Sequence, residues 1–281
     1  MTAIAKTPMA KTPIAVTIAG SDTSGGAGIQ ADLKTFSALG VYGASVIAAL
    51  TAQNTRGVTA IHDVPPDFIA AQIDAVFSDL AVGAVKIGML SQPQTIDAVA
   101  AGLDRHKAQN VVLDPVMVAG SGDRLLAPDA VERLRQALFP RASLITPNLP
   151  EAAALLDAAP ARNETEMEMQ ARRLLDIGAR AVLIKGGHGE GAESVDLLVT
   201  PTSVTRLAAN RIDTRHTHGT GCTLSSAIAA GLAKGRDLPT AVRDAKTYIT
   251  AAIAAADTLA VGQGLGPVHH FHRWWTTETD K

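Results

Sequence analysis

The run HGTGC at residues 218–222 combines the residue types of an anion site with a side chain that can accept a proton. It stands just before an alanine-rich segment, residues 223–232, that is expected to form a helix. Glycines at a helix start let backbone N–H groups converge on an anion, and the helix dipole adds about half a positive charge there. The run predicts a phosphate cradle of Gly219, Thr220 and Gly221, although an ordinary turn before a helix would use the same glycines.

Cys222 is the single cysteine of the chain and falls in the first turn of this expected helix. The helix dipole is expected to lower the pKa of the thiol from about 8.5, so that it can take a proton from a bound hydroxyl. A lone cysteine is more often inert packing, and that alternative stays open. One cysteine excludes an intramolecular disulfide and a multi-thiolate zinc site, and it indicates a reducing compartment.

Oxygen and amine side chains follow three of the expected strands. Asp114 comes directly after one apolar run, and Asn148 and Glu151 follow the next with an N-x-x-E spacing. Such ligands suit Mg²⁺, which keeps most of its waters and is held by few carboxylates plus phosphate. They are equally typical of a turn aspartate and of a helix cap with a first-turn glutamate. Lys185 ends a further strand, where it could point at phosphate oxygens or lie in solvent.

A glycine-rich loop follows the first expected strand. Residues 26–31 read GAGIQA, which is formally the G-x-G-x-x-A pattern of dinucleotide-binding proteins. The acidic residue required about 20 positions later is missing, because TAQN stands at residues 51–54. The sequence also contains no glycine-rich loop ending in Gly-Lys-Ser or Gly-Lys-Thr. A bound nucleotide must therefore be held in another way.

Three histidines near the C-terminus, His269, His270 and His272, could imitate a metal cluster. We do not expect a metal site there, because no adjacent carboxylate or thiol completes the ligand shell. The flanking Trp274 and Trp275 indicate instead a tail that packs on the surface.

The elements that must position these groups alternate between strand and helix. Short apolar runs bounded by glycine or proline indicate the strands, and apolar residues at helical spacing indicate the helices. Such alternation predicts a mostly parallel sheet covered on both faces, with a ligand crevice at the carboxyl ends of the strands. The expected strands are residues 14–19, 84–87, 111–113, 144–146, 181–184, 195–199 and 204–207, and the expected helices are residues 29–39, from 66, from 93, 129–138, 167–177, 223–232 and 240–256.

Length and composition favour one globular domain. The chain has 281 residues, of which 47% are hydrophobic and 19% charged, and no linker or composition shift divides it. We expect a flexible N-terminal tail at residues 1–13 and one domain over residues 14–281. The formal charge of -2 argues against binding to nucleic acid. No apolar run approaches the roughly 18 to 20 residues of a membrane span and no secretory signal is apparent, so a cytoplasmic protein is expected.

Seven ordered motifs together give the chain a family resemblance that none of them carries alone. The chain resembles the hydroxymethylpyrimidine and phosphomethylpyrimidine kinases of thiamine biosynthesis, which belong to the ribokinase-like superfamily. The resemblance runs from about Ile14 to the tail, and it implies a single-domain, three-layer α/β/α sandwich with a mostly parallel central sheet. The motifs are AGSD at 19–22, GGAGIQAD at 25–32, KIGML at 86–90, DPVM at 114–117, TPNLPE at 146–151, KGGH at 185–188 and HGTGC at 218–222.

The resemblance implies transfer of the γ-phosphoryl group of ATP to 4-amino-5-hydroxymethyl-2-methylpyrimidine, and then to its monophosphate to give the diphosphate. One pocket would serve both steps. Gly219, Thr220 and Gly221 would form the anion hole. Cys222 would stand where most of the superfamily carries an aspartate base, a departure that matches the pyrimidine kinases. The resemblance also implies a homodimer.

The remaining roles implied by the resemblance concern substrate, nucleotide and metal. Asp32 and Gln53 would hydrogen-bond the aminopyrimidine edge. Asp114 and Glu151 would hold Mg²⁺ beside the phosphates. The ring would be lined by Gly20, Met89 and Val116, and ATP would be contacted by Asn148, Lys185 and Lys246.

Three other functions stay open at this point. Pyridoxal or pyridoxine kinase activity is the nearest, because relatives accept either ring alcohol. A non-catalytic sensor could bind pyrimidine or nucleotide on the same scaffold. A nicotinamide-dependent dehydrogenase is weakened by the missing ribose-binding acid.

Overall fold

A computed structural model describes residues 11–118, 125–126, 129–187 and 191–275. The expected flexible tail therefore lies almost wholly outside the described residues, since only 11–13 of it are included. The strands are β1 (Ile14–Gly20), β2 (Tyr42–Asn54), β3 (Gly57–Asp63), β4 (Ala84–Ile87), β5 (Val111–Leu113), β6 (Leu144–Ile145), β7 (Val182–Lys185), β8 (Glu193–Val199) and β9 (Val204–Asn210). The helices are α1 (Gly28–Ala38), α2 (Pro66–Asp79), α3 (Pro93–Arg105), α4 (Ala130–Leu138), α5 (Leu149–Leu156), α6 (Glu164–Asp176), α7 (Thr220–Ala233) and α8 (Leu238–Ala254).

All nine strands form one sheet in the order β3-β2-β1-β4-β5-β6-β7-β8-β9. The strands from β2 through β1 to β7 pair in parallel, whereas β3, β8 and β9 add antiparallel partners at the two edges. The expectation of a mostly parallel sheet in a single α/β domain is confirmed. Its parallel strands all end at one edge, which is where a ligand crevice forms in such sheets.

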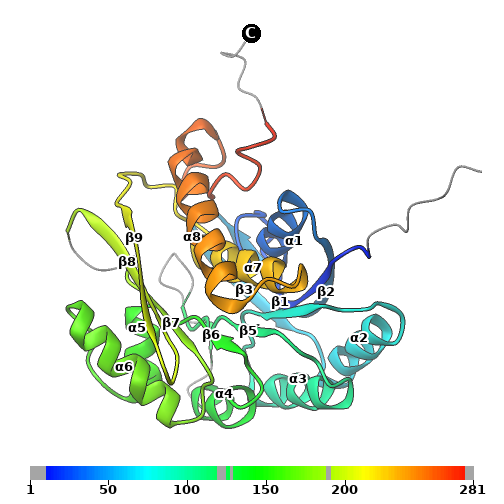
Figure 1. The fold of residues 1–281 in the computed structure, drawn as a ribbon. Helices are drawn as coiled ribbons and strands as arrows, with labels where there is room; N and C mark the ends of the chain where they lie inside the picture. Colours follow the sequence, from blue (N-terminus) through cyan, green and yellow to red (C-terminus); the bar gives the residue numbers. More distant parts are fainter. Residues whose placement is uncertain (1–10, 119–124, 127–128, 188–190, 276–281) are drawn as a thin grey trace, which may run out of the picture.

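Helices cover both faces of the sheet (Figure 1). Helices α1, α7 and α8 lie above it in that view, and α2 to α6 lie below it. Each layer closes its own apolar core, and successive strand residues alternate between the two. In β5, Val111 and Leu113 pack into the lower core while Val112 packs into the upper one. Such strands read as continuous apolar runs because both of their faces are buried.

The hairpin of β2 and β3 is the element that sequence patterning missed. These two strands pair antiparallel at one edge of the sheet. Most residues of β3 are exposed, and β2 mixes buried and exposed positions without strict alternation. A periodicity argument depends on a buried face, which an edge strand largely lacks. Helix α6 also begins earlier than expected, because the Asn163 side chain caps it by accepting the backbone N–H of Glu166.

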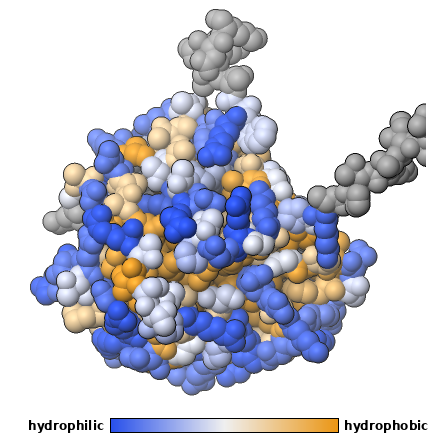
Figure 2. Space-filling view, viewed as in Figure 1, coloured by the Kyte–Doolittle hydropathy of each residue, from blue (hydrophilic) through white to orange (hydrophobic). Residues whose placement is uncertain are grey.

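The surface carries apolar and polar residues in bands. Figure 2, viewed from the same side as Figure 1, shows apolar side chains across the middle of this face between polar residues above and below. Across the described parts of the chain, no helix has the length and apolar content needed to span a bilayer.

Candidate active site

A cavity of about 750 Å³ opens at the carboxyl ends of the parallel strands. It is where the strand order and the connecting loops predict a ligand crevice. Every sequence-predicted site residue except Asp32 lines it. Those residues are Gly20, Gln53, Met89, Asp114, Val116, Asn148, Glu151, Lys185, Gly219, Thr220, Gly221, Cys222 and Lys246.

The start of α7 forms one wall of this cavity. Gly219 is its N-cap and has a φ of 80°, in the left-handed region that a side chain disfavours. The first N–H groups of a helix have no acceptor within the helix, so this end offers donors and a partial positive charge. A Cβ built on Gly221 would lie 3.1 Å from Lys185 Nζ, which shows how close this ammonium group is to the helix start. The N–H groups at the start of α7 and the ammonium group of Lys185 are together suited to bind a phosphate group.

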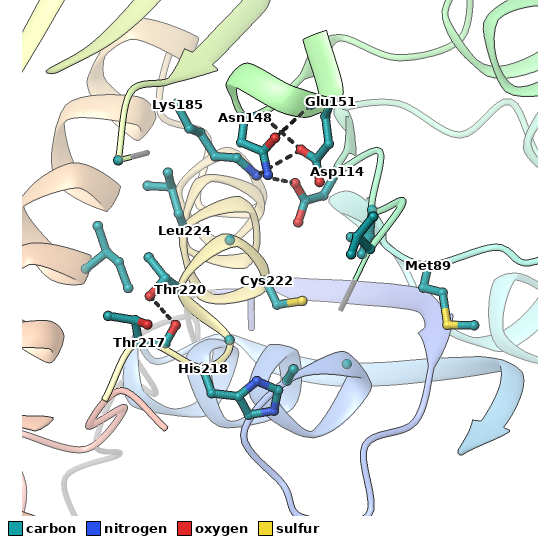
Figure 3. Close-up of a pocket in the computed structure, with 18 of the residues that line it drawn as sticks. Met89, Asp114, Asn148, Glu151, Lys185, Thr217, His218, Thr220, Cys222 and Leu224 are labelled. Atoms are coloured by element: carbon teal, nitrogen blue, oxygen red, sulfur yellow. Dashed lines mark hydrogen bonds and ion pairs between the residues drawn. The ribbon is translucent and has the colours of Figure 1, made fainter. Parts of the chain in front are cut away.

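The thiol of Cys222 stands on the same wall. Cys222 is half-buried, and its sulfur points into the space between Met89, His218 and Asp114 (Figure 3). Burial raises the pKa of the thiol to about 11, and the charges of Asp32 and Asp114 act in the same direction. The expectation that the helix dipole lowers this pKa is therefore wrong. Desolvation and two carboxylates outweigh the opposing influences, which come from Lys86 and the Gly28 N–H.

Lys185 and two carboxylates meet beside the start of α7 (Figure 3). Lys185 Nζ lies 2.8 Å from Asp114 Oδ1 and 3.8 Å from Glu151 Oε2. Asn148 and Glu151 form a capping box at the start of α5. The Asn148 side chain accepts from the Glu151 N–H at 2.8 Å, and Glu151 accepts from the Asn148 N–H at 2.7 Å. The capping alternative is therefore confirmed, and the same residues also face the cavity.

The two carboxylates of this group differ in charge. Burial raises the pKa of Glu151 to about 7, and Asp114 adds to this while Lys185 opposes it. Burial alone would also raise the pKa of Asp114, but Lys185 and Lys86 outweigh it and hold that pKa below its usual value. Asp114 and Lys185 are thus a charged pair, whereas Glu151 exchanges its proton near neutral pH. Binding of a cation at this point would favour the ionised form of Glu151.

Asp114 and Glu151 fit a magnesium ion that arrives with phosphate. Mg²⁺ prefers oxygen ligands and is usually held by one or two carboxylates together with waters and substrate phosphates. Within the described residues, no cluster of three or more histidine, cysteine, aspartate or glutamate side chains could hold a metal ion. His270 of the C-terminal group points inward instead, with Nε2 3.0 Å from Thr223 Oγ1.

Asp32 is not placed to read a ring. Its side chain is buried and does not line the cavity. Both carboxylate oxygens lie 2.9 Å from Lys86 Nζ, and they also accept from the hydroxyls of Thr17 and Ser226 at 2.6 Å each. These internal partners use the oxygens that were expected to hydrogen-bond the aminopyrimidine edge. The predicted role of Asp32 therefore disagrees with its position, and Gln53 keeps its place in the cavity wall.

Asp22 and His218 are two polar cavity residues to which sequence reasoning assigned no role. His218 Nε2 lies 2.8 Å from Asp22 Oδ2 and 3.5 Å from the carboxamide nitrogen of Gln53. Asp22 also accepts backbone N–H groups of its own loop, from Ala27 at 2.7 Å and Gly26 at 3.0 Å. Burial opposes ionisation of Asp22, but hydrogen bonds from His218 and Ser24 lower its pKa well below the usual value. Both residues stand in motifs that carry the family resemblance, which was the available signal.

The far end of the cavity is more apolar. Leu224, Ile249 and Ile253 line it. Lys246 lies beside them on α8, with Nζ 2.8 Å from Asp196 Oδ2 and 3.1 Å from the Ser194 carbonyl oxygen. This part of the cavity wall combines apolar side chains with the Lys246–Asp196 ion pair.

Comparisons with known proteins agree with this geometry. A family model described as phosphomethylpyrimidine kinase matches residues 22–269. A hydroxymethylpyrimidine/phosphomethylpyrimidine kinase from Rhizobium meliloti is 62% identical over 264 residues, which cover 94% of this chain and 99% of the relative. The pyridoxal kinase of Bacillus subtilis in its ADP complex is 37% identical with a TM-score of 0.87, covering 94% of this chain and 100% of that one. A phosphomethylpyrimidine kinase from Clostridium difficile is 46% identical with a TM-score of 0.76, covering 86% and 100%.

Proposed function

Because this chain belongs to the phosphomethylpyrimidine kinase family, we propose how its cavity carries out the two phosphoryl transfers of that activity. Its activity is the phosphorylation of hydroxymethylpyrimidine and of its monophosphate in thiamine biosynthesis, and solved relatives in complex with ADP or AMP-PCP support ATP as the phosphoryl donor. The observation that carries the proposal is the common cavity of the Cys222 sulfur, the start of α7 and the Lys185–Asp114 pair. Together they supply a proton acceptor, donors for a transferring phosphoryl group and a cation that neutralises it.

The pyrimidine would occupy the end of the cavity near Gln53, Met89 and Val116. A carboxamide presents a donor and an acceptor side by side, as the edge of an aminopyrimidine does. Gly20 completes this wall. With Asp32 held by Lys86, Gln53 is the predicted residue that is left to read the ring edge. Leaving such a partner unpaired would discriminate strongly against a ring without matching groups.

Transfer of the phosphoryl group would run toward the start of α7. The hydroxymethyl oxygen forms a bond to the γ-phosphorus of ATP, the bond from that phosphorus to the bridging oxygen of ADP breaks, and the hydroxyl proton passes to the sulfur of the Cys222 thiolate. The N–H groups of Gly219 and Gly221 would stabilise the charge on the moving group, while the N–H of Thr220 donates to the Thr217 carbonyl oxygen at 3.2 Å. Because such transition states are loose, positioning and electrostatic stabilisation contribute most of the rate acceleration. The thiolate accepts the hydroxyl proton late in the step.

Asn148, Lys185 and Lys246 would contact ATP, and Asp114 and Glu151 would hold a magnesium ion together with its phosphates. That ion would neutralise phosphate charge when bound. Lys185 stays charged because Asp114 and Glu151 outweigh the effect of burial and raise its pKa. It can therefore move from Asp114 to a phosphate oxygen without changing its own protonation. Lys246 would approach the nucleotide from α8.

Conversion of the free pyrimidine alcohol tests this activity directly. The protein is incubated with ATP, Mg²⁺ and 4-amino-5-hydroxymethyl-2-methylpyrimidine, and mass spectrometry counts the phosphates added. Successive products with one and then two phosphates are expected. Binding of both ligands without a phosphorylated product would instead indicate a non-catalytic sensor.

Pyridoxal phosphorylation is a second candidate activity. It is favoured by the close superposition on a pyridoxal kinase over nearly the whole chain. Pyridoxal has a hydroxymethyl group on an aromatic nitrogen ring but lacks the aminopyrimidine edge. A competition assay with equal amounts of both alcohols separates the two activities, and faster consumption of the pyrimidine is expected.

We infer further that the protein acts as a homodimer in the cytoplasm. Apolar side chains are exposed along the edge hairpin, with 47% of Leu50 and 39% of Ile61 accessible. Edge strands with exposed apolar residues favour pairing with another chain. Light scattering coupled to gel filtration should give twice the 29.0 kDa chain mass, and Leu50→Lys should shift it toward the monomer.

A further inference from the structure

Lys86 forms a buried ion pair beneath the active site, and the mechanism above does not use it. It is a residue of β4, and neither its side chain nor that of Asp32 has any exposed surface. Its Nζ lies 2.9 Å from each oxygen of Asp32, yet Lys86 is also part of the cavity wall. An ion pair taken out of water is a weak source of stability, because desolvation offsets the attraction of the charges. The position of the pair next to the cavity therefore calls for a functional explanation.

The pair is tied directly to the helix that carries the thiol. Ser226 donates from α7 to Asp32 Oδ1 at 2.6 Å. Ser226 follows Cys222 by four residues, and residues four apart lie one above the other on the same helix face. Thr17 of β1 holds the other oxygen of Asp32. Lys86 and Asp32 are thus fixed from two elements on the side of α7 from which Cys222 projects.

Charges from several elements act on Cys222. Lys86 on β4 and Lys185 on β7 favour its thiolate form, as does the backbone N–H of Gly28 at the start of α1. Asp32 on α1 and Asp114 after β5 oppose it. Lys86 has the strongest effect among these charges, and its influence exceeds that of Asp32. Although burial disfavours a charged lysine, Asp32 raises the pKa of Lys86, so the ammonium persists.

We propose that Lys86, held in place by Asp32, is a positioning residue that stabilises the thiolate of Cys222 as the acceptor of the substrate's hydroxyl proton. This proposal rests on the proposed function of Cys222. In the balanced step, the hydroxymethyl oxygen bonds to the γ-phosphorus, ADP leaves with the electron pair of the broken bond, and the proton moves to the sulfur. The new thiol then loses its proton to solvent. Asp32 thereby acts on the reaction through Lys86, in place of direct recognition of the ring.

The thiol can be titrated alone, because the chain has a single cysteine. Alkylation by iodoacetamide is followed from pH 7 to 11 with neither ATP nor pyrimidine present. Lys86→Met should slow alkylation at pH 9 by about tenfold, since one pKa unit changes the thiolate fraction by that factor. Asp32→Asn should slow it as well, because burial then favours the neutral form of Lys86, whose effect on the thiol exceeds that of Asp32. Lys86→Arg should stay near wild type, as should the exposed control Lys107→Met.

The response to Lys86→Arg separates this role from a purely structural one. A purely structural lysine predicts that the bulkier arginine disturbs this fully buried site at least as much as methionine does, whereas the proposed role predicts that keeping the positive charge keeps the thiol pKa near wild type. The double variant Asp32→Asn/Lys86→Met leaves no unpaired charge in the buried site, so we expect it to fold. Circular dichroism tests that expectation. This double variant should shift the pKa upward, less than Lys86→Met alone. An unchanged thiol pKa in Lys86→Met, or a shift in Lys86→Arg as large as that in Lys86→Met, would overturn the proposal.

Turnover then distinguishes failure of this proposal from failure of the proposed function. Lys86→Met should reduce kcat strongly in the wild-type background and little in a Cys222→Ala background, because it acts through the thiol. An equal loss in both backgrounds would overturn the proposal while leaving the kinase function intact. Full activity of Cys222→Ala by itself would remove the thiol from the mechanism and this proposal with it.

Discussion

Gly219 packs directly against the carbonyl oxygen of Gly26, so closely that a Cβ added at Gly219 would lie 1.8 Å from that atom. The contact joins the loop before α7 to the loop before α1. Asp22 and His218 reinforce the same junction with a side-chain hydrogen bond of 2.8 Å. The anion cradle is therefore shaped by two loops that lie far apart in the sequence.

Gly219→Ala should abolish activity and destabilise the protein. Its cost combines a left-handed φ, about 1 to 2 kcal/mol for a non-glycine residue, with a clash against backbone. Gly235→Ala is the matched control, because Gly235 has a φ of 78° but nothing within 4 Å of an added Cβ. Urea unfolding should show a much larger loss for Gly219→Ala. Equal losses would mean that the contact with Gly26 carries no energy.

Cys222→Ala should lower kcat by about 10²- to 10⁴-fold, the usual contribution of a general base, while ATP binding survives. Calorimetry measures the binding, and the coupled assay measures kcat. Since the thiol pKa is about 11, only a small thiolate fraction exists at neutral pH. The wild-type rate should therefore rise with pH toward that value, about tenfold per unit. If the rate of Cys222→Ala rose with pH at the same slope, the pH dependence would belong to another titratable group.

Gln53→Ala should raise the KM for the pyrimidine far more than the KM for ATP. The carboxamide lines the substrate end of the cavity and lies beside His218, away from Lys246. Loss of a hydrogen-bonded pair in a buried site costs about 1 to 3 kcal/mol, or roughly 10- to 100-fold in KM. Gln109→Ala, at an exposed position, should change neither constant. Equal increases in both constants would show that the pyrimidine binds elsewhere.

Glu151→Gln should flatten the dependence of stability on pH between about 4.5 and 7. Burial raises the pKa of Glu151 in the folded protein to about 7, above its ordinary value of 4.5. The folded state therefore holds a proton that the unfolded state loses, so this contribution is full below pH 4.5 and is lost as pH rises through 7. The variant should lose on the order of 2 kcal/mol less than wild type across that interval. Urea unfolding at pH 5 and pH 8 measures the difference.

Local patterns determined most of the architecture and most of the site. Apolar runs and helical periodicity predict β1, β4 to β9 and the helices because each depends on a few neighbouring residues and on a buried face. The positions of Asp114, Asn148 and Lys185 just after strands place them at one edge of a parallel sheet. The β2–β3 hairpin escaped this reasoning, since β2 mixes buried and exposed positions irregularly and most residues of β3 are exposed.

The protonation and partners of the site residues were decided only by the tertiary structure. Asp32 belongs to a family motif, but only the folded chain shows that Lys86, 54 residues away, occupies its carboxylate. A helix dipole is local to Cys222 and predicts a low thiol pKa, whereas burial and carboxylates brought in by α1 and β5 raise it. Sequence therefore specifies which groups reach the cavity. Their charges depend on desolvation and on neighbours that only folding assembles.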